Sequence, residues 1–217
     1  MNPLEQEADV RNRPTITLPE HVRADIRRVV AEAGDVDETG VSLFGVVIGG
    51  RRVVLAAVGP GPRATHTPVF YQPDVDYVNA AFDALKSALP SICWIGEFHV
   101  HPSGMAWLSG HDRKTMQRLL ADKELQLVDF VAGILQRHGS DIAIHPYWFS
   151  RSVPEGQAAT VEVVESSADV VREARMRAAE DRADKPGSDQ REEREADAPV
   201  RQRWLGKVVS LLRRKNT

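Results

Sequence analysis

Residues 91–100 of this chain, SICWIGEFHV, run directly into His101 and Pro102, and this stretch decides the fold. The run is mostly apolar, β-branched and aromatic, and prolines at positions 90 and 102 bound it, which predicts a buried strand. Side chains two residues apart on a strand share one face, so His99 and His101 present two imidazoles side by side. The sequence therefore predicts a pair of metal-ligand candidates at the end of a buried strand.

The residues after this strand supply a third ligand candidate. Ser109 offers a hydroxyl at the expected N-cap of a helix that begins near Gly110, and Asp112 falls in the first turn of that helix, where the helix dipole favours a carboxylate. Two imidazoles and one carboxylate leave one position of a tetrahedral ion free, which is typical of a catalytic zinc site. An HxH pair alone is more often two ordinary histidines, but HxHP followed by six residues and SxxD is a far more restrictive pattern.

Zinc-dependent hydrolysis also needs a carboxylate base near the ion. Glu97 lies on the same strand face as His99, but neighbours on one face are roughly 7 Å apart along the chain. Glu38 opens the segment ETGVSLFG, which reads as a turn followed by a strand that could lie beside the histidine strand. Both glutamates are therefore candidates for the base.

At this point the chain resembles the JAMM metalloproteases, the zinc-dependent MPN-domain family. The family signature pairs an upstream Glu with HxHP, six residues and SxxD, and prokaryotic members commonly carry ETGGxLxG where this chain has ETGVSLFG, with Val41 in place of a second glycine. The resemblance spans about residues 15–150. It implies that His99, His101 and Asp112 bind Zn²⁺, and that Glu38 is the general acid/base, with Glu97 as the alternative. It also implies that Ser109 hydrogen-bonds the oxyanion of the tetrahedral intermediate.

The resemblance carries expectations about fold and partner as well. It implies an α/β fold of the MPN (JAB-like, cytidine-deaminase-like) type, a mixed β-sheet flanked by helices. It implies an isopeptidase or peptidase that cleaves after the C-terminal tail of a ubiquitin-like protein, in deconjugation or precursor processing, within a bacterial ubiquitin-like conjugation or antiphage system. The alternatives are a noncatalytic MPN-type scaffold and a peptidase that processes a sulfur-carrier protein.

Hydrophobic periodicity places the other elements of this domain. Helices are expected over residues 19–34 and 74–89, a hairpin over 42–58 turning at Gly49–Gly50, and strands over 127–135, 141–149 and 160–165. The resulting order, αββαβαββ, predicts an α/β sheet with mixed or mostly antiparallel pairing. Between the hairpin and the second helix lies a loop rich in proline and glycine. A loop of this length is often functional, so His66, Phe70 and Tyr71 are candidates for holding a substrate tail. The alternative is a plain surface loop.

Composition limits the class of protein. The chain has 217 residues, a net charge of −3 and one cysteine, so we expect one catalytic domain, no nucleic-acid partner and no disulfide framework. A charged N terminus without a signal-peptide core and the lack of a long apolar run favour a cytoplasmic protein.

The segments outside the expected domain, 15–165, differ in character. Residues 1–14 are expected to be a flexible N terminus, 166–183 a helical extension and 184–198 a disordered linker. Residues 199–217 combine an apolar face with only positive charge, which predicts a basic amphipathic helix for contact with an anionic membrane or a partner, or for packing on its own domain.

Overall fold

The computed structural model describes residues 13–48 and 50–165. The predicted helical extension (166–183), linker (184–198) and basic amphipathic helix (199–217) lie outside these residues, as do all but the last two residues of the predicted flexible segment 1–14. The described helices are α2 (Glu20–Glu32), α3 (Val75–Ala88) and α4 (Gly110–Ala121). The strands are β1 (Thr15–Pro19), β2 (Thr39–Ile48), β3 (Arg51–Val58), β4 (Thr65–Thr67), β5 (Phe70–Gln72), β6 (Cys93–Val100), β7 (Asp129–His138), β8 (Asp141–Ser150), β9 (Gln157–Ala158) and β10 (Thr160–Val164). In this part of the chain no helix is long and apolar enough to cross a bilayer.

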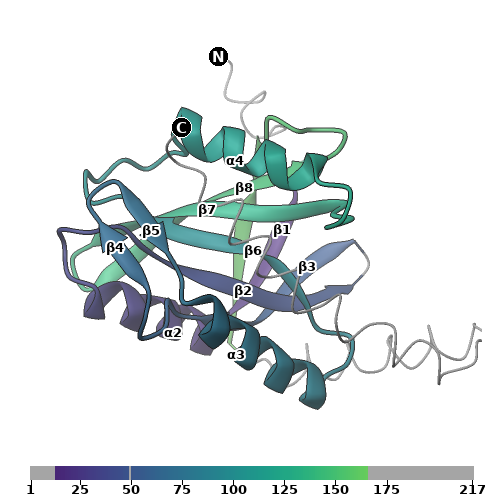
Figure 1. The fold of residues 1–217 in the computed structure, drawn as a ribbon, viewed down its shortest axis with the longest axis horizontal. Coiled ribbons are helices and arrows are strands. Elements are labelled where there is room, and N and C mark those ends of the chain that lie inside the picture. Colours follow the sequence, from purple (N-terminus) through teal and green to yellow (C-terminus); the bar gives the residue numbers. More distant parts are fainter. Residues whose placement is uncertain (1–12, 49, 166–217) are drawn as a thin grey trace, which may run out of the picture.

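One curled sheet dominates the described residues (Figure 1). Its eight strands lie in the order β10-β1-β3-β2-β6-β7-β8-β9, with β6 and β7 parallel at its centre and β2 antiparallel to β6. The two edge strands, β9 and β10, are separated in the chain only by Ala159, so the backbone itself joins the two edges of the sheet. The result is a nearly closed, barrel-like sheet.

Arg52 shows how far the sheet curls. It lies on β3, yet its guanidinium forms an ion pair with Asp129 at the start of β7 and stacks over the Trp148 ring of β8, at 4.7 Å from the ring centroid. β3 and β8 are separated by three strands in the sheet order, so these contacts are made across the inside of the curve. Both partners of the ion pair are largely shielded from water, which strengthens their attraction relative to a surface pair.

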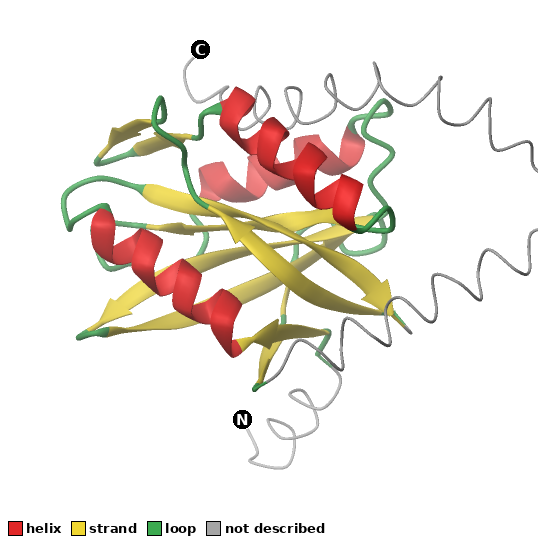
Figure 2. Ribbon diagram, turned by 90° about the horizontal axis from the view of Figure 1, so that it is seen from below, coloured by secondary structure: helices red, strands yellow, loops and turns green. Residues whose placement is uncertain are grey.

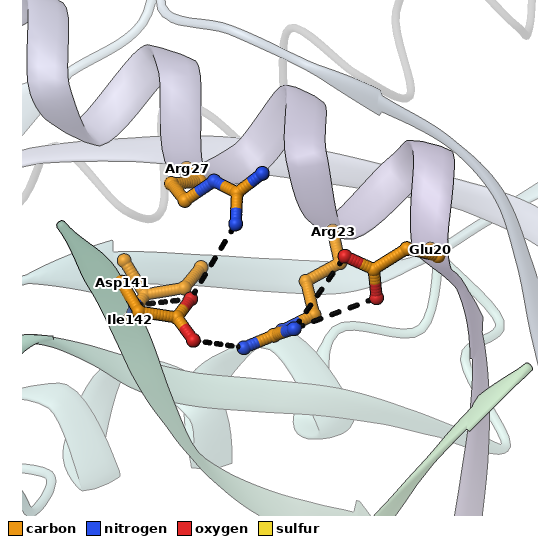
Figure 3. Close-up of polar contacts among 5 residues, drawn as sticks. All are labelled: Glu20, Arg23, Arg27, Asp141 and Ile142. Atoms are coloured by element: carbon orange, nitrogen blue, oxygen red, sulfur yellow. Dashed lines mark hydrogen bonds and ion pairs between the residues drawn. The ribbon is translucent and has the colours of Figure 1, made fainter.

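Helix α2 makes a second set of contacts across the same closure, on the side of the sheet where Trp148 lies (Figure 3). Arg23 donates to Asp141 at 2.6 Å, Arg27 approaches the same carboxylate at 3.8 Å, and Glu20 also contacts Arg23. Asp141 begins β8, whereas α2 directly follows β1, so the contacts join elements from opposite parts of the sheet order. These pairs are half exposed, so water and salt screen their attraction and they contribute little to stability.

Helices lie on both sides of the sheet (Figure 2), and an apolar cluster fills the space on each side of the central strands. One cluster joins α2 to residues such as Val41, Leu43 and Phe98, and the other joins α3 and α4 to residues such as Phe44 and Ile134. Alternation along β6 sends Phe98 and Val100 toward the α2 side, which leaves His99 and His101 for the α4 side.

The prediction of a helix-flanked MPN-type α/β sheet was wrong. The described chain is mostly strand, with three helices and a sheet that nearly closes on itself. The sequence reading missed β1, although Thr15, Ile16, Thr17 and Leu18 alternate as a strand does, and β1 pairs with both β3 and β10. Without β1 the sheet has no strand through which its two ends can meet.

Gly45 tests the tight packing at the bulge between β2 and β3. A Cβ at this position would overlap the Val53 carbonyl oxygen, and backbone on a paired strand cannot move aside. We expect Gly45→Ala to lower the free energy of unfolding by about 3 kcal/mol in urea denaturation. The control Gly110→Ala adds a Cβ with nothing within 4 Å and should change stability by less than about 1 kcal/mol. Equal stability of the two variants would contradict this packing.

Candidate metal centre

Strand β6 and helix α4 bring the three predicted ligands together. His99, His101 and Asp112 are all buried, at 7, 6 and 7% exposure, and their candidate ligand atoms lie within 4.8 Å of one another. The His99 Nε2 and His101 Nε2 atoms are 2.9 Å apart, and Asp112 Oδ2 lies 3.8 and 3.4 Å from them. Ligand atoms around a tetrahedral zinc are about 3.3 Å apart, given bonds of about 2.0–2.1 Å, so the described group fits a metal ion.

The first turn of α4 holds Asp112 in place. Ser109 is the N-cap: its hydroxyl accepts from the Asp112 N–H at 3.1 Å and donates to Asp112 Oδ2 at 2.6 Å, while its own N–H donates to the same oxygen at 2.8 Å. This reciprocal capping box satisfies backbone donors that the helix start would otherwise leave free. The same bonds aim the carboxylate at the two imidazoles.

Within this group, the negative charge of Asp112 and positive charge on the imidazoles stabilise each other. Burial lowers the pKa of His99, but the hydrogen bond and charge of Asp112, together with the charges of Glu97 and Glu38, outweigh it, so the pKa lies above its ordinary value. Burial raises the pKa of Asp112, but hydrogen bonds from His101, His99 and Ser109 hold it well below its usual range. The carboxylate is therefore ionised and stabilises positive charge at the imidazoles, whether that charge is a proton or a metal ion.

Nδ1 of His101 is buried and has no hydrogen-bond partner among the described residues. Metal-binding histidines usually donate from their second nitrogen to a carboxylate, carbonyl or water. The orientation of this ring therefore depends on its Nε2 side, where the other two ligand candidates lie.

Glu38 lies beside this group at the start of β2. Gly40 is paired with His99 and Thr39 with Val100, and continuing the register by one residue brings Glu38 level with His101, on the ligand face. Glu38 is buried, at 8% exposure, and its charge reaches His99. Glu97 is half-buried, is paired with Ser42 and also acts on His99, so both glutamates remain near the site.

Gly40 explains how the two strands fit together at the site. A Cβ there would lie 2.7 Å from the Phe98 carbonyl oxygen and 2.9 Å from the Tyr71 ring, so no side chain fits between β2, β6 and the hairpin. Val41, the departure from the prokaryotic JAMM pattern, is 1% exposed and packs in the cluster on the α2 side. The substitution therefore falls on the face away from the metal-ligand group.

The loop residues His66, Phe70 and Tyr71 belong to the short β4–β5 hairpin, which Figure 1 shows beside the end of the main sheet. His66 Nδ1 lies 2.9 Å from the Glu38 carbonyl oxygen, and Tyr71 donates to the Gly40 carbonyl at 3.2 Å. Phe70 is half-buried, and its carbonyl accepts from the Thr67 hydroxyl at 3.2 Å. The sequence reading found these residues but missed that two of them contact the strand of the candidate base.

No family model matches this chain, and no curated protein matches it. Among solved structures, the chain is similar to a Desulfitobacterium hafniense protein whose solution structure is known, with a TM-score of 0.52 and 18% identity. The similarity covers 70% of this chain and 94% of that protein. At this identity the likeness supports the strand-dominated fold alone.

Metal binding can be measured directly. We expect the purified protein to bind about one Zn²⁺ per chain, and His99→Ala, His101→Ala and Asp112→Ala each to weaken binding by more than about 100-fold, because a site with three protein ligands has none to spare. Isothermal titration and elemental analysis would measure this, with His138→Ala, at the exposed end of β7, as a control that binds normally. Full zinc binding by His101→Ala would contradict the site.

The capping box gives a second expectation. Ser109→Ala should lower the free energy of unfolding by about 0.5–2 kcal/mol and weaken zinc binding roughly 10- to 100-fold, because the cap and the orientation of Asp112 are lost together. Ser103→Ala, on the same loop at an exposed position, should change neither. Unfolding and zinc titration of the two variants would show whether the effects are coupled.

Proposed function

We propose that this protein is a zinc-dependent peptidase or isopeptidase of the JAMM type, acting after the C-terminal tail of a ubiquitin-like protein. The observation that supports it most is the convergence of His99, His101 and Asp112 in a buried group, with Glu38 level with His101 on the adjoining strand. The proposal rests on this residue pattern and geometry, because the fold departs from the one that the resemblance implies.

A zinc ion at this site would polarise a scissile carbonyl and lower the pKa of water at its open position. Glu38 would take the proton from the attacking water and return it to the leaving amine, which a buried carboxylate beside the ligands can do.

Ser109 has a different role in the described contacts from the one that the resemblance implies. Its hydroxyl donates to Asp112 Oδ2, so the hydrogen is directed at the ligand carboxylate. For Ser109 to stabilise an oxyanion, this hydrogen would have to leave Asp112. We therefore assign Ser109 first to positioning Asp112, and the oxyanion role stays a prediction.

Cleavage is tested with a panel of ubiquitin-like and sulfur-carrier β-grasp proteins that carry a short C-terminal extension. We expect the zinc-loaded protein to release the extension from at least one member, and chelation or His101→Ala to abolish this, as measured by intact mass. If a fully zinc-loaded protein leaves every member intact, the peptidase assignment fails and the noncatalytic scaffold is favoured.

The choice of base is tested by a matched pair of substitutions. Glu38→Gln should keep zinc and fold but lower kcat roughly 100- to 10,000-fold, since it removes a positioned proton carrier while preserving shape. Glu97→Gln should have a much smaller effect. The reverse order of effects, measured on the same cleaved substrate, would assign the base to Glu97.

A further inference from the structure

The β4–β5 hairpin binds the backbone on both sides of the candidate base. The Glu38 N–H donates to the Thr67 carbonyl at 2.8 Å. The Glu38 carbonyl accepts from His66, whose Nδ1 must carry the hydrogen because a carbonyl can only accept. Two residues along, the Gly40 carbonyl accepts from the Tyr71 hydroxyl. Both backbone polar groups of Glu38 are thus held by one short element.

The main sheet does not pair with the backbone of Glu38, so the backbone hydrogen bonds of this residue come from the hairpin. The pairing of β2 with β6 begins at Thr39, and residues 34–37 before it form a bend-rich connection. Glu38 therefore sits at the point where the ladder of the main sheet ends. Its position is fixed by the neighbouring strand on one side and by the hairpin on the other.

His66 and Tyr71 form one unit within the hairpin. They are directly paired across its two strands, and their ring centroids are 5.6 Å apart. A two-stranded hairpin of three residues a strand has little stability of its own, so its order depends on what it packs against. The Tyr71 ring fills the space above Gly40 that any larger residue would occupy. The hairpin and the segment that carries Glu38 and Gly40 therefore stabilise each other's conformation.

We propose that His66 and Tyr71 are positioning residues that fix Glu38 relative to the metal-ligand group. This inference rests on the proposed function, because it assigns Glu38 the role of base. It also revises the expectation that these two side chains grip a substrate tail, since the Nδ1 of His66 and the hydroxyl of Tyr71 are engaged by the protein's own backbone.

The test uses the full chain loaded with Co²⁺, whose visible absorption reports on the site without any substrate. Glu38→Gln should shift the pH profile of this absorption, because it removes a charge beside the ion. Tyr71→Phe and His66→Phe should shift the profile in the same direction by a smaller amount. Tyr77→Phe, at an exposed tyrosine on α3, should leave it unchanged.

A conservative variant separates positioning from a general loss of structure. In His66→Asn the side-chain amide can place an N–H where Nδ1 stood, so this variant should restore the wild-type profile that His66→Phe loses. Hydrogen exchange gives a second readout: the amide of Glu38 should exchange roughly fivefold to tenfold faster in Tyr71→Phe and His66→Phe, as expected for weakening one hydrogen bond.

The outcomes distinguish the two proposals. If Glu38→Gln leaves the Co²⁺ profile unchanged, Glu38 is not beside the ion and the proposed function loses its base. If Glu38→Gln shifts the profile but Tyr71→Phe and His66→Phe do not, or if His66→Asn behaves like His66→Phe, the positioning inference alone is overturned.

Discussion

The register of β2 against β6 is the constraint on which the candidate site depends. Pairing of Gly40 with His99 sets Glu38 level with His101 and places both on the face that α4 covers. A slip of one residue would turn Glu38 toward the opposite cluster, because side chains alternate between faces. The register is held by the absence of a side chain at Gly40 and by Val41 and Phe98, which are paired and buried together on the other face.

Much of the site could be predicted from the sequence because its residues are close in the chain. His99 and His101 are related by strand alternation, and Ser109 and Asp112 by the spacing of a helix cap, so local geometry alone relates each pair. The helices were also predictable, since Val22, Ile26, Val29 and Val30 repeat at helical spacing and are buried on α2. Glu38 is more than sixty positions from His101, and only the resemblance connected them before the structure did.

The curvature of the sheet could not be predicted in the same way. It depends on contacts between residues far apart in the chain, such as Arg52 with Asp129 and Trp148, and no local pattern in the sequence indicates them. It also depends on β1, whose alternation was visible but whose partners, β3 and β10, are parallel and distant in sequence. The contacts of the hairpin could not be predicted for a similar reason. His66 and Tyr71 form hydrogen bonds with the backbone carbonyls of Glu38 and Gly40, and backbone contacts leave no side-chain motif in the sequence.

The contacts that stabilise the fold around His99, His101 and Asp112 also orient the side chains of the candidate site. The capping box stabilises the start of α4 and at the same time directs Asp112, so the helix cannot begin elsewhere without displacing a ligand. On the opposite side, the hairpin gains its order from the backbone of β2 and in return fixes Glu38. A buried carboxylate is costly without compensation, and here the hydrogen bonds from Ser109 compensate Asp112 and also set its direction. The candidate site is therefore formed by the folding contacts themselves, and a substitution that loosens either α4 or the hairpin should disturb the candidate site before it unfolds the sheet.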